Sequence, residues 1–134
     1  MQKIIEIILV GKDGSLSSLL INNFKEEKLY KLCGFKSSMN FEKQGTWKVD
    51  FHGIKYNIHV YGRREGRWDM KNHYKFPPPF SRFQLFGTSA IVAREIKENG
   101  KEDVVSITMD TWKTLYERFF TFHTEFQSFF DIDH

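Results

Sequence analysis

The sequence predicts an α+β domain with a mainly antiparallel sheet built from hairpins and two helices, one short after the first strands and one C-terminal. Three observations favour this fold class. Apolar and polar side chains alternate on both sides of His52-Gly53, which is the period of strands with one buried face. Apolar side chains near the C-terminal end recur at helical spacing. The signals run strand, strand, helix, hairpin, loop, hairpin, helix, an order typical of α+β domains.

The composition is that of a folded globular protein. Its 134 residues indicate one globular domain spanning residues 1–134, with 40% hydrophobic and 28% charged residues. The single cysteine, Cys33, excludes an internal disulfide and any zinc site that needs two thiolates. The histidines show no paired metal spacing, so we expect no metal and no cofactor. A formal net charge of +3 permits an acidic partner without requiring one.

The first strand signal is the run from Ile4 to Val10, whose β-branched side chains suit a buried strand. With Glu6 in its middle, the run is too short and too charged for a signal peptide or a membrane span, so we expect no membrane role. Residues 11–14 form a turn, after which residues 15–21 return as a second, less regular strand.

The short helix is predicted over residues 24–33. Asn23 and Glu26 are spaced as a helix cap and its capping-box partner, and Gly34 follows the expected end. Cys33 is then a small core residue rather than a nucleophile. The face of this helix that we expect to be buried is formed by Leu29, Leu32 and Cys33.

The central hairpin is specified in register. Residues 35–45 are a polar linker into it, and a two-residue turn at His52-Gly53 suits a primed turn because Gly53 accepts positive φ. His52 is a less usual first turn residue, which leaves a longer loop open. A shift of one residue would bury lysines. The predicted cross-strand pairs are Phe51 with Ile54, Val49 with Tyr56, Trp47 with Ile58, and, on the solvated face, Asp50 with Lys55.

The last third of the chain predicts a second hairpin and the C-terminal helix. Residues 82–96 indicate a long strand that bends at Gly87, and residues 104–107 pair back after a turn at 98–100. A two-residue loop would set Ile96 against Asp103, which favours a longer loop or a bulge. Either Thr108 or Asp110 caps the final helix. Its apolar stripe comprises Met109, Trp112, Leu115, Tyr116, Phe119, Phe122, His123 and Phe126.

The loop 62–82 is the first candidate for function. It holds six Lys and Arg side chains against two acidic ones, a net charge of +4, so the remainder of this +3 chain carries −1. Cations neutralise phosphates and flat rings stack on unpaired bases, which makes this mixture suitable for single-stranded nucleic acid. The alternative is a solvated loop whose aromatic residues fold back onto the core. The candidate binding residues are Arg63, Arg64, Arg67, Trp68, Lys71, Tyr74, Lys75 and Arg82.

Two further segments invite an interaction. The run Pro77-Pro78-Pro79 fixes an extended backbone, either as a rigid spacer or as a peptide ligand for an aromatic groove. The C-terminal segment holds more phenylalanine than one helical face can bury against a small core, which indicates a second copy of the chain or another protein as partner. A tail that wraps over the sheet is the alternative. The candidate interface residues are Phe120, Phe122, Phe126, Phe129 and Phe130.

Signals for catalysis are poor. There is no glycine-rich phosphate loop and no nucleophile elbow, so we expect a protein that is not an enzyme and assign no catalytic residue. His59 with Asp50 or Tyr61 is the one conceivable proton-transfer site, but strand histidines beside water are usually polar surface.

Several motifs together resemble a family of small, uncharacterised proteins encoded by nucleocytoplasmic large DNA viruses such as the marseilleviruses. The most specific is the Asn-x-Tyr-x-Phe-Pro-Pro-Pro run that begins at Asn72. The resemblance implies a viral protein that acts inside an infected cell, in the cytoplasm, a viral factory or the nucleus. The partners that we expect from the loop 62–82 and from the C-terminal segment are nucleic acid, a second copy of the chain, or a host or viral protein. The other matching segments are Val10-Gly11-Lys12-Asp13-Gly14, Leu29 to Phe35, Tyr61-Gly62-Arg63, Glu65-Gly66-Arg67, Leu85-Phe86-Gly87, Ala90 to Ala93, and Trp112, Tyr116 and Phe119.

Overall fold

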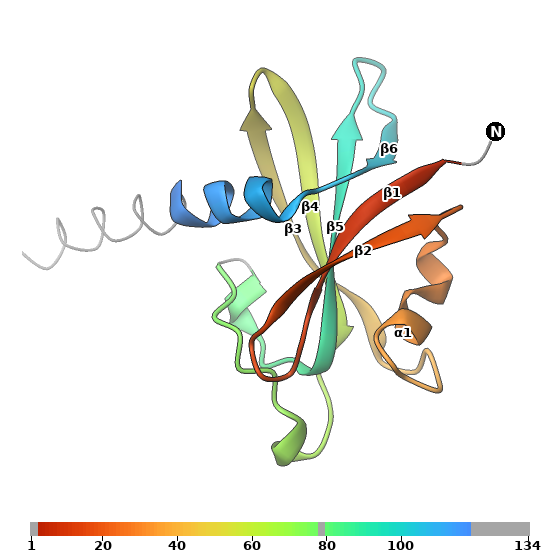
Figure 1. Cartoon of the computed structure of the whole chain (residues 1–134), viewed down its shortest axis with the longest axis vertical. Coiled ribbons are helices and arrows are strands. Elements are labelled where there is room, and N and C mark those ends of the chain that lie inside the picture. Colours follow the sequence, from red (N-terminus) through yellow and green to blue (C-terminus); the bar gives the residue numbers. More distant parts are fainter. Residues whose placement is uncertain (1–2, 78–79, 119–134) are drawn as a thin grey trace, which may run out of the picture.

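The computed structural model describes residues 3–77 and 80–118. Its centre is an antiparallel sheet in the order β2-β1-β5-β4-β3, with β6 paired to β5 outside this path. A short helix follows the first two strands and a second helix covers residues 109–118, which confirms the predicted α+β class (Figure 1). The elements are β1 (Ile4–Val10), β2 (Leu16–Asn22), η1 (Glu26–Lys28), α1 (Leu29–Leu32), β3 (Phe41–Phe51), β4 (Ile54–Arg63), η2 (Trp68–Met70), η3 (Phe80–Arg82), β5 (Phe86–Ile96) and β6 (Glu102–Val105).

The β3–β4 hairpin has the predicted register, with all four expected pairs in place. His52 and Gly53 both take positive φ, 55° and 80°, as a two-residue type I′ turn requires. The prediction of a linker over residues 35–45 is wrong at its end, because β3 already begins at Phe41. A β-bulge between Lys43 and Gly45 interrupts the two-residue period, and this hid the strand from pattern analysis.

Strand β5 is the centre of the sheet, and β1 and β6 share one of its sides. β1 pairs with residues 89–91 and β6 with residues 93–96. Of the two alternatives, a longer loop or a bulge, the structure has the longer loop: Ile96 lies opposite Glu102, and residues 97–101 join β5 to β6. The strand begins at Phe86 and not at residue 82, because residues 80–82 form η3. Figure 1 shows the β1–β2 pair turned steeply against β3, β4 and β5.

The short helix differs from its prediction at the start and agrees at the end. Asn23 has a left-handed φ of 53° and donates its N–H to Lys3 O at 3.1 Å, so it extends the β1–β2 ladder and caps nothing. Helical structure begins at Glu26 as a 3-10 turn. Gly34 ends it with a φ of 85°, and the bond from Phe35 N–H to Tyr30 O completes a Schellman motif. Leu29 and Cys33 are buried as expected, whereas Leu32 is 41% exposed.

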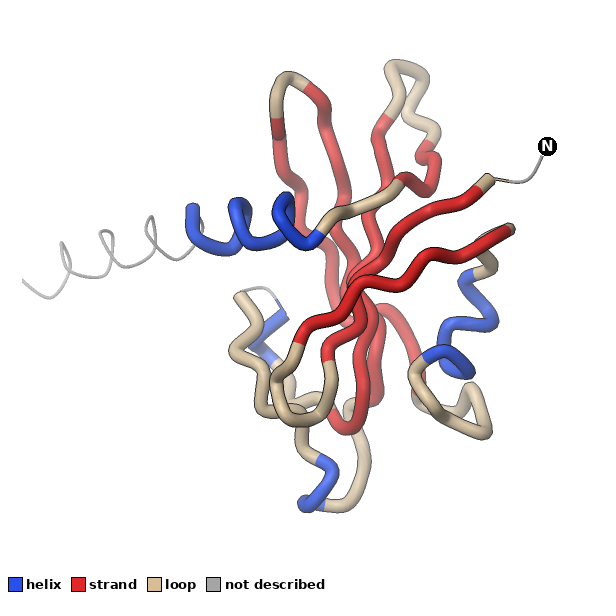
Figure 2. Tube along the Cα trace, in the orientation of Figure 1, coloured by secondary structure: helices blue, strands red, loops and turns tan. Residues whose placement is uncertain are grey.

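The two helices cover opposite faces of the sheet, and each face has its own core (Figure 2). Thr108 caps the C-terminal helix by accepting the N–H of Thr111 at 3.0 Å, and Trp112 and Leu115 are buried as predicted. We call the core beneath this helix the Trp112 core; it contains Ile8, Val10, Ile58, Val60, Phe76, Phe80, Leu85, Ile91, Ala93, Ile107, Trp112 and Leu115. The core beneath α1, the Cys33 core, contains Ile5, Ile7, Leu29, Cys33, Tyr61, Ala90 and Val92.

Some predicted features lie outside the described residues. These are Pro78 and Pro79, the apolar stripe from Phe119 onward, and the five candidate interface phenylalanines Phe120, Phe122, Phe126, Phe129 and Phe130. No helix among the described residues is both long enough and apolar enough to span a bilayer.

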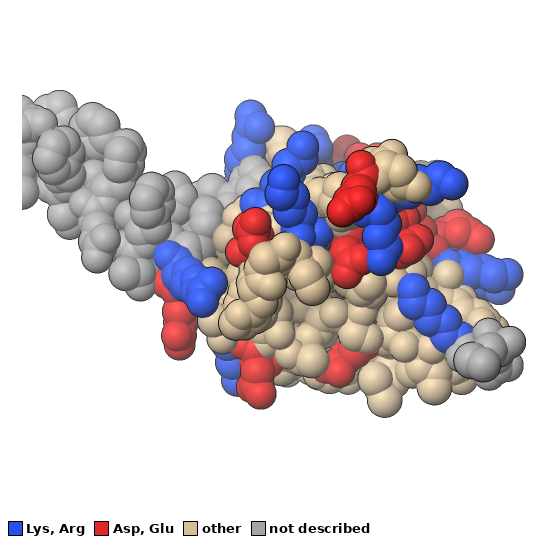
Figure 3. All heavy atoms as spheres, turned by 90° about the horizontal axis from the view of Figure 1, so that it is seen from above, with Lys and Arg blue, Asp and Glu red and all other residues tan. Residues whose placement is uncertain are grey.

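Charges of both signs are intermingled at the end of the sheet that carries the two hairpin turns (Figure 3). Lys97 forms ion pairs with Glu95 and with Asp103 there, and Asp50 lies opposite Lys55. This end of the molecule therefore offers no surface of a single charge sign.

Candidate functional site

The loop after β4 forms a small projection at the end of the sheet opposite the hairpin turns (Figure 1). We call residues 64–71 the Trp68 lobe. The backbone of the lobe makes one 3-10 turn, η2, in which Met70 N–H bonds to Arg67 O at 2.9 Å. The side chain of Trp68 is 80% exposed, and that of Met70 is 38% exposed. A tryptophan so exposed is unusual, because its ring contributes strongly to stability when it is buried.

A buried amide holds the base of the lobe. Asn72 is 5% exposed and donates from Nδ2 to Val10 O at 3.1 Å and to Gly87 O at 2.9 Å. Its Oδ1 accepts the N–H of Tyr74 at 2.9 Å. These bonds fix the lobe to the ends of β1 and β5. They also give the Asn-x-Tyr part of the sequence motif a structural role.

Two contacts hold residues 64–66, where the lobe leaves β4. Arg64 donates from Nε to Gln44 Oε1 and places its guanidinium 3.7 Å from the centre of the Phe83 ring. At Gly66 the backbone lies so close to Phe86 that a β-carbon there would be 2.8 Å from a side-chain carbon of Phe86. Only glycine therefore fits at this position without a shift of the neighbouring chain.

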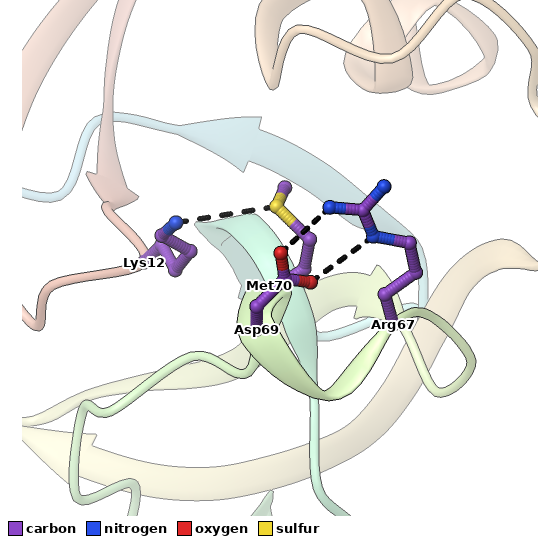
Figure 4. Close-up of polar contacts among 4 residues, drawn as sticks. All are labelled: Lys12, Arg67, Asp69 and Met70. Atoms are coloured by element: carbon purple, nitrogen blue, oxygen red, sulfur yellow. Dashed lines mark hydrogen bonds and ion pairs between the residues drawn. The ribbon is translucent and has the colours of Figure 1, made fainter.

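The cationic side chains of the lobe differ in whether they form an ion pair. Arg67 and Asp69 form a two-bond ion pair, with distances of 2.6 and 3.1 Å (Figure 4). The hydrogen bond from Arg67 lowers the pKa of Asp69, and the same contact raises the pKa of Arg67. Such an exposed pair adds little stability, but it neutralises the Arg67 charge. Lys71 lies on the same lobe and forms no ion pair among the described residues.

A further cation reaches the lobe from the β1–β2 turn. Lys12 Nζ lies 4.0 Å from Met70 Sδ, as Figure 4 shows, and forms no ion pair with any described residue. The main chain fixes this neighbourhood, because His73 donates its N–H to Lys12 O at 2.9 Å. Lys12 and Met70 were not predicted as site residues. No local pattern indicates them, since they lie 58 positions apart in the sequence.

Two of the candidate binding residues point away from the lobe. Arg63 is half-buried, donates to Ser37 O at 3.0 Å and lies 4.4 Å from the centre of the Phe35 ring. Tyr74 accepts the indole N–H of Trp112 at 2.9 Å, and burial raises its pKa to about 12. Tyr74 is thus a member of the Trp112 core periphery and is not positioned as a free stacking platform.

The remaining candidates lie along the return path of the loop. Lys75 is exposed, and its carbonyl accepts the hydroxyl of Tyr116 at 2.8 Å. Arg82, at the end of η3, lies 5.9 Å from the Phe83 ring centre. Phe76 and Phe80 are buried. The structure therefore divides the predicted loop into a lobe that carries one exposed ring and a return segment whose aromatic residues pack inward.

The histidine of the conceivable proton-transfer site is buried and does not meet solvent. His59 is 3% exposed, and its Nδ1 lies 3.0 Å from Thr46 Oγ1. Burial lowers the pKa of His59, and the charges of Lys43 and Arg94 act in the same direction. The hairpin face that carries His59 was expected to be solvated. It is exposed at the tip, at Asp50 and Lys55, but buried at Asn57 and His59. A cleft of about 230 Å³ lies on the other face, lined among others by Phe51, Tyr56, Ile58 and Leu115 but not by His59.

Metal-ligating side chains do not gather in the part of the chain that the structure describes. No three His, Cys, Asp or Glu side chains there lie close enough together to hold a metal ion. The Cys33 thiol is buried, which raises its pKa to about 12.

The chain was compared with known proteins in three ways. No protein-family model, no curated protein and no solved structure matches it.

Proposed function

We propose that this chain is a non-enzymatic protein that binds single-stranded nucleic acid through the Trp68 lobe. One observation carries the proposal: Trp68 is 80% exposed on a turn that is anchored to the sheet. Lys71 follows it in the same turn, with its N–H bonded to Trp68 O at 3.3 Å, and Lys12 reaches Met70 from the neighbouring turn. One aromatic ring is thus accompanied by two cations that form no ion pair with a described carboxylate.

The chemistry of this arrangement suits an unpaired base with its flanking phosphates. Every base has an apolar face that can stack on an indole, whatever its sequence. Ammonium groups beside the ring neutralise the backbone and release counterions. Because Asn72 already fixes the base of the lobe, little conformational entropy is lost when a ligand binds.

The size of the lobe favours a single strand over a duplex. A duplex hides the faces of its bases, and proteins read it with a helix or a two-stranded ribbon that enters the major groove. The lobe presents one 3-10 turn, Trp68–Met70, which offers neither element. The intracellular viral setting that the sequence resemblance implies remains a prediction.

The first test is binding of fluorescent oligonucleotides, measured by anisotropy across a salt series. With Lys12, Lys71 and Arg64 as phosphate contacts, the slope of log affinity against log salt should be about −2 for single strands. Single-stranded oligonucleotides should bind more tightly than duplexes of the same sequence. Affinity that does not depend on salt, or a preference for the duplex, would contradict the proposal.

Substitutions then separate the ring from the charges. Trp68→Ala should weaken binding by about 2 kcal/mol, or about thirtyfold, without lowering the melting temperature, because this side chain is exposed. The double variant Lys12→Gln/Lys71→Gln should flatten the salt slope by about 1.4. The matched control is Lys48→Gln/Lys55→Gln on the exposed face of the β3–β4 hairpin, which makes the same change in net charge. A control that weakens binding as much as the lobe variant would indicate non-specific attraction only.

A further inference from the structure

We propose that the free edge of β2 pairs with β2 of a second copy of this chain, so that two sheets join into one. β2 (Leu16–Asn22) ends the strand order, and its one strand partner among the described residues is β1. The Trp68 lobe lies elsewhere on the molecule, at the turn end of β1, so this pairing is independent of nucleic-acid binding.

The hydrogen bonds of β1 show which groups of β2 point outward. Glu6 uses both its main-chain groups on the side away from β2: its N–H donates to Ser106 Oγ at 2.8 Å, and its carbonyl accepts Ile107 N–H at 2.9 Å. Glu6 lies opposite Leu20 in the register, so the N–H and C=O of Leu20 point away from β1. By the same alternation, the other outward-facing residues of β2 are Leu16, Ser18 and Asn22.

The two edges of the sheet are protected very differently. β3 carries charged side chains at Glu42, Lys43, Lys48 and Asp50 and a bulge beside Gln44, which are the usual devices against edge pairing. β2 has the sequence Leu-Ser-Ser-Leu-Leu-Ile-Asn, without a charge, a proline or a register shift. An edge of this kind is a template for another strand.

A second copy of the same strand fits this edge well. A two-fold axis through Leu19 lets β2 overlap its copy over its whole length, with Ser18 opposite Leu20 of the second copy. All the outward main-chain groups then find partners, and no like charges meet. Leu20 is 68% exposed, and the added strand would place Ser18 of the second copy directly beside it.

Sedimentation velocity of the full chain over a concentration series tests the pairing. A seven-residue strand contact is small compared with a standard interface, so we expect a dimer that dissociates on dilution. Leu20→Pro removes the outward N–H and no bond to β1, so it should lose the dimer and keep the far-UV spectrum of the wild type. A wild type that stays monomeric up to about 1 mM, or a Leu20→Pro variant that stays dimeric, overturns the proposal.

Two other variants keep the test decisive if the proline disturbs folding. Leu20→Lys retains the N–H and brings a charge to the edge, and it too should lose the dimer. The control Ile54→Thr removes an apolar side chain that is also exposed, by 41%, but lies at the far hairpin, and it should leave the dimer intact. Loss of the dimer in Ile54→Thr but not in Leu20→Lys would place the contact elsewhere and refute the pairing.

Disulfide trapping tests the register. In a Cys33→Ala background, Leu19→Cys places two thiols across the axis in a pair with Cα atoms about 4.5 Å apart, within reach of a disulfide. Mild oxidation should yield a covalent dimer on a non-reducing gel. Ser17→Cys, which would face Ile21 of the second copy, should remain a monomer under the same conditions. Equal trapping of both variants would refute the full-overlap register.

Discussion

Single residues at the base of the Trp68 lobe determine how the lobe is held against the sheet. Asn72, Gln44 and Gly66 hold the backbone at the base of the lobe that carries Trp68, although none of them carries charge or an aromatic group. Arginine and tryptophan carry recognisable binding chemistry, whereas the amides that hold the lobe in place do not. Arg67 shows the reverse case, since it has the expected chemistry but its charge is neutralised by Asp69 two residues later.

His59 leads to a prediction about the dependence of stability on pH. Burial lowers its pKa in the folded state below the usual value of 6.5, so on acidification the unfolded chain binds a proton at this residue first. The free energy of unfolding should therefore fall as the pH drops below about 6.5, and the stability that His59 contributes is complete above that pH. Urea denaturation at about pH 7 and at about pH 5 measures this change. In His59→Gln that part of the pH dependence should disappear, and a variant with an unchanged profile would exclude His59 as its source.

At the scale of elements, the β3–β4 turn is strained at one of its two positions. Gly53 takes its φ of 80° without cost, but His52 has a φ of 55°, in a region that residues with a β-carbon rarely adopt. Asparagine tolerates this region better than histidine and gives the Asn-Gly sequence that type I′ turns prefer.

Substitutions at the two positions of this turn should change the stability of the fold in opposite directions. His52→Asn should raise the melting temperature, whereas Gly53→Ala should destabilise the fold by about 1 kcal/mol because alanine must adopt the left-handed conformation. Both residues are exposed, and nothing lies within 4 Å of a β-carbon added at Gly53, so packing contributes little to Gly53→Ala. His52→Asn also removes the edge-to-face contact of the His52 ring with Phe51, whose centroids are 4.1 Å apart, which offsets part of the gain. Thermal unfolding followed by circular dichroism compares the two variants with the wild type. If Gly53→Ala melted with or above the wild type, the type I′ assignment would be wrong.

The whole molecule consists of two cores on either side of one sheet. β1, β4 and β5 contribute to both, since alternate side chains of the same strand enter the Trp112 core and the Cys33 core. Neither core can lose its strands while the other keeps them. The shared strands therefore predict a single cooperative unfolding transition.

Two probes already present in the chain test this cooperativity. Cys33 reports on one core through its reaction with a thiol reagent, which its burial and a pKa of about 12 suppress in the folded state. Trp47 and Trp112 report on the other core by fluorescence once Trp68→Phe has removed the exposed indole. In a urea series the two signals should change with the same midpoint. Separate midpoints would mean that one face of the sheet opens before the other.

Much of the fold follows from local pattern. The sequence alone predicts both hairpins, their order and the register of β3 with β4, because the side-chain period of two leaves one way to bury Trp47, Val49 and Phe51. It also predicts a helix cap at Thr108 or Asp110, of which Thr108 is the one observed, and the glycine that ends α1, because both depend on neighbouring residues only. It indicates the region of the candidate site through the local surplus of charge and aromatic side chains in residues 62–82.

Other features were decided by tertiary structure, because they depend on contacts between distant segments. The sharing of β5 between β1 and β6, the inward packing of Tyr74, Phe76 and Phe80, and the exposure of Trp68 belong to this group. The two cores accept only the side chains that fit against helices on opposite faces, and no periodicity within the loop distinguishes Trp68 from the rings that are buried. The sequence thus determined the strands and where charge collects. Packing across the sheet decided that, in the loop 62–82, Trp68 stays exposed while Phe76 and Phe80 are buried.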